Sequence, residues 1–184
     1  MSLNCDVLIA GGGVVGLAVG KELLVSNPKL KVVVIEKERT LGFHASGRNS
    51  GVLHAGFYYS PDSLKAKFCR EGNRELRELC QRHSIPVINT GKIVVAKNNT
   101  ELNELEKLYL RGLQNDVKIE LLEEKQLKEY EPHARTHERF LWSPTTGVSD
   151  PHAVIAGLSR EFVDLGGTLI HSSLLEVKDN GRIT

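Results

Sequence analysis

The sequence contains few cysteines and no set of them that would form a disulfide framework or a metal site. Its 184 residues include three, Cys5, Cys69 and Cys80. An odd number cannot pair completely, and their spacing matches no set of metal ligands. Cys69 and Cys80 fall within one helical pattern, so we expect them to be small apolar core residues. This cysteine usage predicts a protein of a reducing compartment, and hence a cytoplasmic location.

Strong charge of one sign and long apolar runs are also lacking. The 24 Lys and Arg residues nearly balance the 23 Asp and Glu residues, which gives a net charge of +1. Because nucleic-acid-binding proteins usually carry a basic cluster, we expect no nucleic-acid partner. The apolar run Val7–Ala10 is far shorter than the roughly 20 residues that span a bilayer, and no signal-peptide pattern surrounds it. Any contact with a membrane, such as a respiratory membrane, would therefore be peripheral.

The most informative feature is the glycine-rich turn after this apolar run. Gly11, Gly13 and Gly16 have the spacing G-x-G-x-x-G, between a predicted strand and a helix predicted at 14–26. In dinucleotide-binding proteins the first glycine allows the turn, the second lets the backbone approach the pyrophosphate, and the third allows close packing of helix on strand. The free N–H groups of the helix N-terminus then face the anion. Val15, in the first helical turn, is included in this predicted cofactor site.

A second predicted strand ends in an acidic residue. The run Lys31–Ile35 is typical of a parallel strand buried on both faces, and Glu36 follows it, 20 residues after Gly16. An acid at this position accepts hydrogen bonds from the ribose hydroxyls of an adenine dinucleotide. Lys37 is a candidate for contact with the adenosine or the pyrophosphate. A glycine turn alone would also fit a plain loop, but the combination predicts a βαβ dinucleotide-binding unit.

The stretch after Glu36 distinguishes between cofactors. A nicotinamide-binding domain usually continues with another helix and parallel strand, but residues 37–50 are polar and rich in small side chains. Such a segment can line an extended cofactor as far as a flavin ring. FAD is therefore the predicted cofactor. A nicotinamide dinucleotide is the alternative, because the glycine turn and the acid serve both.

The rest of the chain predicts a mixed unit and then a return to the first one. Helices are expected at 64–83, 100–115, 123–130 and 152–165, a β-rich patch at 51–59, and strands at 87–90, 92–96, 118–122, 139–143, 168–171 and 174–179. The predicted fold class is α/β, an incomplete Rossmann-like FAD-binding domain of the glutathione-reductase type with an inserted α+β substrate domain. The expected boundaries are 1–85 and 147–184 for the FAD-binding domain and 86–146 for part of the substrate domain.

With these residues considered, the chain resembles the N-terminal half of FAD-dependent oxidoreductases of the D-amino-acid oxidase superfamily. The likeness is greatest to L-2-hydroxyglutarate dehydrogenases or oxidases. It rests on the series from His44 to Tyr59, HASGRNSGVLHAGFYY, followed by Pro61, Ser63–Ala66 and Gly91–Lys92. Members of that family are much longer than this chain. We therefore expect a truncated piece that is inactive alone, because an incomplete sheet with an open edge is poorly stabilised.

The resemblance also implies which residues form the site. The flavin side of the cofactor would be lined by Ser46, Arg48, Asn49 and Ser50, and Val177 would contribute from the returning segment. His54 would remove the hydroxyl proton of a 2-hydroxy acid, since an imidazole has a suitable pKa. Its alternative role is a packed histidine beneath the flavin. Tyr58 would donate a hydrogen bond to the substrate carboxylate.

The implied reaction is the oxidation of L-2-hydroxyglutarate to 2-oxoglutarate by hydride transfer to the flavin. Oxygen or a quinone would accept the electrons. Two alternatives stay open: a relative that oxidises amines or amino acids, and a non-catalytic fragment that binds a dinucleotide or acts as an interaction module. No metal is expected, because the histidines share no ligand spacing with acidic residues or cysteines.

Overall fold

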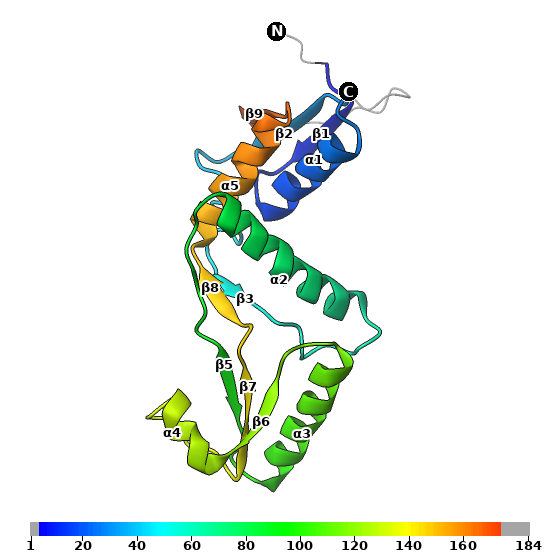
Figure 1. Cartoon of the computed structure of the whole chain (residues 1–184). Helices are drawn as coiled ribbons and strands as arrows, with labels where there is room; N and C mark the ends of the chain where they lie inside the picture. Colours follow the sequence, from blue (N-terminus) through cyan, green and yellow to red (C-terminus); the bar gives the residue numbers. More distant parts are fainter. Residues whose placement is uncertain (1–3, 174–184) are drawn as a thin grey trace. The chain divides into compact units, whose positions relative to one another are not determined.

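The computed structural model describes residues 4–173 and divides the chain into two compact units. Unit 1 consists of Met1–Ser50 and Asp150–Thr184, and unit 2 consists of Gly51–Ser149. Figure 1 labels their helices and strands. The helix expected at 64–83 thus lies in unit 2, whereas the expected first segment of the FAD-binding domain, 1–85, includes it. The assignment of 1–85 and 147–184 to an FAD-binding domain, and of 86–146 to a substrate domain, concerns function and stays a prediction.

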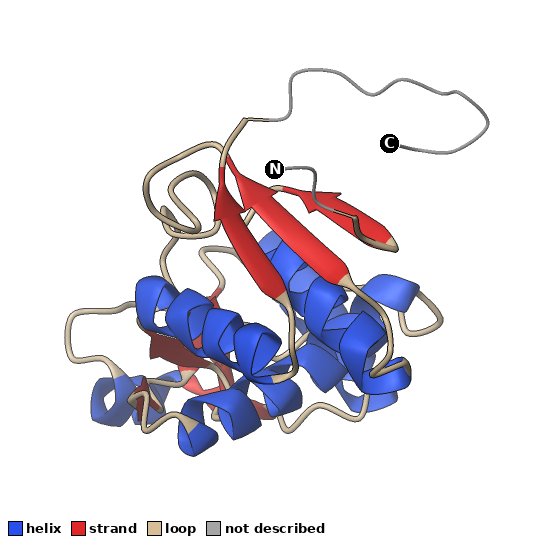
Figure 2. Ribbon diagram, turned by 90° about the horizontal axis from the view of Figure 1, so that it is seen from above, coloured by secondary structure: helices blue, strands red, loops and turns tan. Residues whose placement is uncertain are grey.

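Unit 1 is a parallel sheet with two helices. Its elements are β1 (Val7–Ala10), α1 (Val14–Ser26), β2 (Val32–Glu36), α5 (Pro151–Asp164) and β9 (Thr168–His171). The strand order is β1-β2-β9, and both pairs are parallel, as the arrows in Figure 2 show. The predicted βαβ unit is confirmed. The predicted return of the chain is confirmed as well, because β9 pairs with β2 although more than a hundred residues separate them in the sequence.

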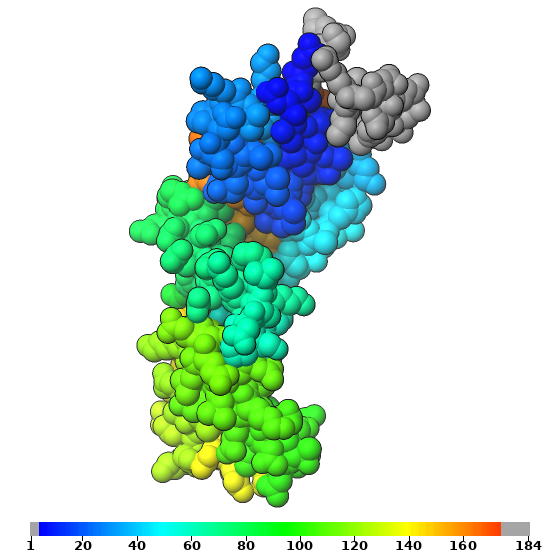
Figure 3. All heavy atoms as spheres, turned by 90° about the vertical axis from the view of Figure 1, so that its right-hand side faces the viewer, coloured from blue at the N-terminus to red at the C-terminus, as the bar shows by residue number. Residues whose placement is uncertain are grey.

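The two helices of unit 1 pack on each other at a glycine. A Cβ atom on Gly20 of α1 would lie 2.8 Å from the ring of Phe162 of α5, which is fully buried. α5 begins with Pro151 after Asp150, whose carboxylate accepts a hydrogen bond from the His152 N–H at 2.8 Å. The blue and orange atoms in Figure 3 show the two segments of this unit side by side. Distant parts of the chain therefore form one core.

Unit 2 contains two small antiparallel sheets and three α-helices. Its elements are β3 (Val52–Leu53), α2 (Leu64–Arg82), β4 (Val87–Ile88), β5 (Lys92–Val95), α3 (Asn99–Gln114), β6 (Glu120–Glu123), a 3-10 turn (Glu124–Gln126), α4 (Leu127–Tyr130), β7 (Arg139–Ser143) and β8 (Gly147–Ser149). The strand orders are β3-β8-β4 and β5-β7-β6. The structure adds β8, a strand that was not predicted. The β-rich patch expected at 51–59 contains only the two-residue strand β3. The strand expected at 174–179 lies outside the described residues.

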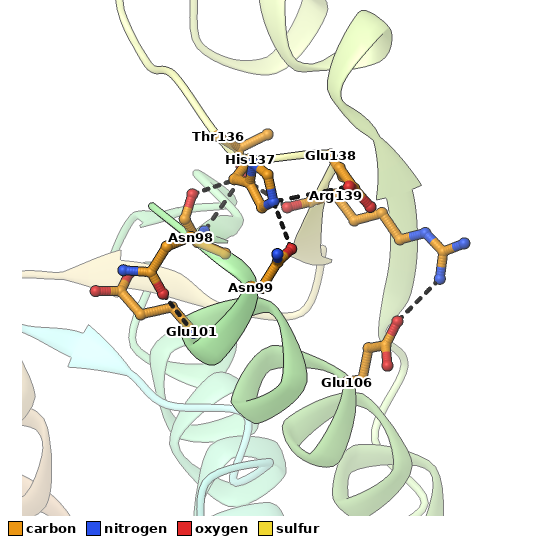
Figure 4. A network of polar contacts seen from close by, with 9 residues as sticks. Asn98, Asn99, Glu101, Glu106, Thr136, His137, Glu138 and Arg139 are labelled. Carbon is orange, nitrogen blue, oxygen red and sulfur yellow. Dashed lines mark hydrogen bonds and ion pairs between the residues drawn. The ribbon is translucent and has the colours of Figure 1, made fainter.

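A polar network fixes the start of α3 to the strand β7, as Figure 4 shows. Asn98 caps the helix by accepting a hydrogen bond from the Glu101 N–H at 3.0 Å, and the Glu101 carboxylate accepts one from the Lys97 N–H at 2.9 Å. The His137 ring lies 2.8 Å from the Asn99 side-chain oxygen. Arg139 reaches Glu106 of α3 at 3.0 Å. The core of unit 2 is built from Ala55, Phe57, Ala96, Leu102, Leu105, Val117, Ile119 and Leu141.

All three cysteines have free thiols. Cys80 is buried, as expected of a core residue, whereas Cys69 is only half-buried. Within the described part of the chain, no helix combines the length and apolarity that crossing a membrane requires.

Candidate functional site

The glycine turn of unit 1 has the geometry that its spacing predicts. Gly11 has a φ of +113°, which favours glycine, and its N–H donates to the Ile35 carbonyl at 2.7 Å. A Cβ atom on Gly16 would collide with the Gly11 carbonyl, so only glycine allows the helix to approach the turn. A Cβ atom on Gly13 would lie 2.8 Å from the Ser46 hydroxyl. The turn thus leaves no room for side chains at the second and third glycines.

Glu36 holds this turn in place. Its carboxylate accepts a hydrogen bond from the Gly12 N–H at 2.8 Å and another from the Glu38 N–H at 2.9 Å. Only 8% of Glu36 is exposed. Burial raises the pKa of this carboxyl, but the hydrogen bonds from Glu38, Gly12 and Lys37, with the nearby His44, together lower its pKa below the ordinary value. Glu36 therefore carries a negative charge at neutral pH. Ribose hydroxyls can donate to it.

Gly12 is a residue of the turn that the sequence motif did not single out. A Cβ atom there would collide with the Leu41 side chain and would lie 3.2 Å from the Glu36 Cβ. Its carbonyl also accepts a hydrogen bond from the Gly42 N–H at 3.1 Å. The three consecutive glycines at 11–13 were the available signal, since the motif itself requires only two of them.

Ser46 connects the polar loop to the N-terminus of α1. Its hydroxyl accepts a hydrogen bond from the Val14 N–H at 3.1 Å, while the N-cap residue Gly13 has no side chain to do so. The end of the helix that would face a pyrophosphate is thus capped by the predicted cofactor loop. This contact places Ser46 with Gly11, Gly13, Gly16 and Glu36 in one cluster.

The other predicted cofactor residues lie less closely around the turn. Asn49 donates to the carbonyls of Ala45 at 3.1 Å and Ser46 at 2.8 Å, so its side chain shapes the loop. The Arg48 guanidinium lies 4.4 Å from the centre of the Phe43 ring. The remaining residues, Val15, Lys37 and Ser50, are exposed. Val177 lies outside the described residues. Direct contact of these six residues with FAD stays a prediction.

A cavity of about 310 Å³ adjoins Glu36. It is lined by Ala10, Gly11, Ile35, Glu36, Lys37, His44, Ser172 and Ser173. A Cβ atom on Gly11 would have no neighbour within 4 Å, so open space lies directly above the turn. An ionised carboxylate, exposed backbone and open space together fit the adenosine end of FAD. His44 lines this cavity, and its ring nitrogen Nε2 lies 2.8 Å from the Glu38 carboxylate.

His54 and Tyr58 lie in unit 2, in a segment whose backbone is fixed by hydrogen bonds from two helices. Asn73 of α2 donates to the carbonyls of Leu53 and His54, both at 3.0 Å. Arg111 of α3 donates to the Tyr58 carbonyl at 2.8 Å. Asn115, which follows α3 and is 4% exposed, donates to the carbonyls of Gly56 at 3.2 Å and Tyr59 at 2.9 Å. The segment 53–59 is therefore held at several points along its length.

Asn73, Arg111 and Asn115 are positioning residues that the sequence analysis missed. Each lies in or directly after a helix for which no site residue was predicted, and each donates to a main-chain carbonyl distant in the sequence. A buried asparagine at the end of an apolar helical stripe was the available signal, because a buried polar group needs partners.

The His54 imidazole is held in its neutral form. Partial burial lowers its pKa, and the positive charge of Lys92 lowers it further. The Lys92 ammonium lies 4.7 Å from the centre of the Tyr58 ring, within range of a cation–π contact. A neutral imidazole can accept a proton, as a general base must. Among the residues at 4–173, no group of three or more His, Cys, Asp or Glu side chains is placed to hold a metal ion.

The comparisons with known proteins agree with this geometry. The family described as "FAD dependent oxidoreductase" matches residues 6–184. The L-2-hydroxyglutarate dehydrogenase, mitochondrial, of Dictyostelium discoideum is 44% identical over 164 residues, which cover 88% of this chain and 37% of the relative. The protein of the same name from Caenorhabditis elegans is 42% identical over 177 residues, which cover 95% of this chain and 41% of the relative. The chain thus spans about two fifths of the length of these relatives.

Among solved structures, the dithionite-reduced L-alpha-glycerophosphate oxidase of Mycoplasma pneumoniae with FAD bound is similar to this chain. The sequence identity is 29% and the TM-score is 0.80, over 92% of this chain and 45% of that one. The predicted α/β class and Rossmann-like FAD-binding fold are confirmed, whereas the inserted substrate domain stays a prediction. The word "mitochondrial" in the relatives' names gives no support to the predicted cytoplasmic location. The predicted cofactor, FAD, is confirmed, because the chain belongs to the family of FAD-dependent oxidoreductases.

Proposed function

We propose that this chain is part of an enzyme that oxidises L-2-hydroxyglutarate to 2-oxoglutarate with FAD. The observation that carries the proposal is the backbone segment of His54 and Tyr58, which Asn73, Arg111 and Asn115 hold by hydrogen bonds. The lowered pKa of His54 favours the neutral imidazole that a general base needs. The names of relatives more than 40% identical to the chain support the choice of substrate.

The reaction moves two electrons and breaks two bonds to hydrogen. The hydroxyl O–H bond breaks as a proton moves to the free ring nitrogen of His54, and the C2–H bond breaks as a hydride leaves carbon. Bound FAD supplies the hydride acceptor. The Tyr58 hydroxyl donates a hydrogen bond to the substrate carboxylate, and Glu36 with the glycine turn binds the adenosine diphosphate half of the cofactor. The second substrate is an electron acceptor, oxygen or a quinone, and a quinone would require peripheral contact with a respiratory membrane.

The test is anaerobic reduction of the FAD-loaded, full-length enzyme by L-2-hydroxyglutarate, followed as loss of flavin absorbance. His54→Asn should slow reduction by about 10²- to 10⁴-fold, because it removes the general base and leaves the cofactor site intact. Since the His54 pKa is lowered, the rate should fall with acidification only below about pH 6.5. His133→Asn, an exposed histidine of unit 2, is the matched control.

Two results would contradict the proposal. One is bleaching by an amine or amino acid but not by the hydroxy acid, which would favour the amine-oxidising alternative. The other is a His54→Asn enzyme that is reduced at the wild-type rate with full FAD content. That result would leave His54 as a packing residue.

A further inference from the structure

We propose that Lys92 selects dicarboxylate substrates by pairing its ammonium group with the distal carboxylate of the 2-hydroxy acid. This inference rests on the proposed function and deepens it. The residues assigned so far account for the hydroxyl group, through His54, and for one carboxylate, through Tyr58. A 2-hydroxy diacid carries a second negative charge, and that charge needs a fixed cation in the site.

The position of Lys92 is determined by the strand that carries it and by the ring on which it lies. Lys92 is the first residue of β5 and pairs with Ser143 of β7 in the antiparallel register. It is half-buried, and its Nζ lies 4.7 Å from the centre of the Tyr58 ring. That ring packs against the buried Phe57 at 4.2 Å between centroids. The Tyr58 carbonyl is also bound by Arg111. The ammonium group therefore lies on a rigid aromatic surface.

Lys92 also acts electrostatically on the proposed base. Its charge is one of the two causes that lower the pKa of His54, and the influence of one charge on another falls with distance. The ammonium is over the face of the Tyr58 ring, whereas the hydroxyl is at the rim of that ring. The inference requires that one small molecule face His54, the Tyr58 hydroxyl and Lys92 together.

No carboxylate in the described part of the chain forms an ion pair with Lys92. Other cations of unit 2 are already occupied by protein groups. Arg70 donates to the Asn115 carbonyl at 2.9 Å, Arg77 donates to Asn73, Asn89 and the Thr145 carbonyl, and Arg111 donates to Tyr58. A half-buried ammonium without a counter-charge loses hydration and gains only the ring contact in return. A substrate carboxylate supplies the missing counter-charge and a charge-assisted hydrogen bond.

The test compares two substrates of equal chain length on the full-length, FAD-loaded enzyme. L-2-hydroxyglutarate carries the distal carboxylate, and L-2-hydroxyvalerate has a methyl group in its place. Lys92→Met should lower kcat/KM for the diacid by about 10- to 100-fold, mainly through KM, because a hydrogen bond between charged groups is lost. The value for hydroxyvalerate should stay the same or rise. Lys92→Arg should keep most of the preference, and Lys118→Met, which removes an exposed lysine of the same unit, should change neither value.

A binding measurement makes the test independent of turnover. Glutarate has the distal carboxylate but no hydroxyl group. Its Kd, measured from the change it causes in the flavin spectrum, should rise by a similar factor in Lys92→Met, while the Kd of valerate should not. If Lys92→Met purifies with less FAD or a lower Tm, Lys92→Gln provides the same comparison with a polar side chain.

Three results with Lys92→Met would each overturn the inference. The variant could lower kcat/KM equally for both substrates, it could leave both values unchanged, or it could bind glutarate as tightly as the wild type does. A purely structural cation–π contact would give one of these results. Failure of the proposed function looks different, because the wild-type enzyme itself would then not be reduced by either hydroxy acid.

Discussion

Glu36 holds the glycine turn with the same carboxylate that we propose to bind the ribose of the cofactor. Its two oxygens provide about four acceptor positions, and the hydrogen bonds from Gly12, Glu38 and Lys37 use three of them. About one position is therefore free for a ribose hydroxyl. Holding the glycine turn and the proposed contact with the ribose therefore use different acceptor positions of one carboxylate.

Replacing Glu36 by Gln should show how much the negative charge of Glu36 stabilises the protein. The hydrogen bonds to its main-chain partners depend on the charge, so we expect the free energy of unfolding at pH 7 to fall by about 1–3 kcal/mol. Because the pKa of Glu36 is lowered in the folded state, the wild-type advantage is complete above the ordinary value of 4.5 and is lost as the pH falls through the folded pKa.

Urea titrations between pH 3 and pH 7 measure this difference directly. The gap between wild type and Glu36→Gln should be constant above about pH 5 and should narrow toward acid. Glu22→Gln, at a side chain that is 64% exposed and pairs with Lys21, should change stability by less than about 0.5 kcal/mol. An unchanged gap at pH 3 would show that the charge of Glu36 does not stabilise the turn.

Among the helices, two glycines in similar positions should respond in opposite ways to the same substitution. Gly20 lies inside α1 and Gly72 lies inside α2, so alanine at either position gains about 0.5–1 kcal/mol of helix propensity. At Gly20 the new methyl group would lie 2.8 Å from the ring of Phe162, which is fully buried and cannot move aside. At Gly72 it would have no neighbour within 4 Å.

Gly72→Ala should therefore stabilise the protein by about 0.5–1 kcal/mol, and Gly20→Ala should destabilise it by about 1–2 kcal/mol net, since overpacking outweighs propensity. Urea-induced unfolding monitored by circular dichroism gives both values, and each variant is the control for the other. Stabilisation by both substitutions would mean that α1 and α5 pack less tightly than the Gly20–Phe162 distance indicates.

The regular elements were predictable where local signals define their ends. α2 begins after Ser63, whose hydroxyl accepts the Ala66 N–H at 3.2 Å, and its bounds match the helix expected at 64–83 to within one residue. Residues 51–59 were misleading, because their apolar side chains fill a core without forming a long strand. Gly56 turns the chain at a φ of +96°, and Phe57 enters the core of unit 2. An apolar run predicts that its side chains are buried, but it does not predict the conformation of the backbone.

At the scale of the whole molecule, the cofactor site proposed in unit 1 and the catalytic residues proposed in unit 2 differ in how far sequence could predict them. Gly11, Gly13, Gly16 and Glu36 lie within one βαβ unit, so their spacing alone defines their geometry. The groups that fix His54 come from α2 and α3, and they act on main-chain carbonyls. Such contacts depend on how helices pack, which has no local pattern. The geometry of the proposed cofactor site was therefore predictable from the sequence, while the contacts that hold the segment of His54 were not.

The division into two units predicts where FAD should stabilise the protein. The residues that fit FAD by geometry belong to unit 1, whose sheet combines β1 and β2 with β9 from the far end of the described chain. A ligand that binds only the folded form stabilises it by about 2.7 kcal/mol at 100 times its Kd, which corresponds to about 100-fold slower hydrogen exchange through unfolding. Adding FAD to the apoprotein should therefore protect β1, the loop 37–50 and β9 more than β5, β6 and β7.

Mass spectrometry of exchanged peptides measures this, and ADP, the corresponding half of the cofactor, should protect the same peptides more weakly. Equal protection of the β5-β7-β6 sheet by ADP would contradict this assignment, because the adenosine diphosphate half would then stabilise unit 2 as much as the unit that contains its cavity.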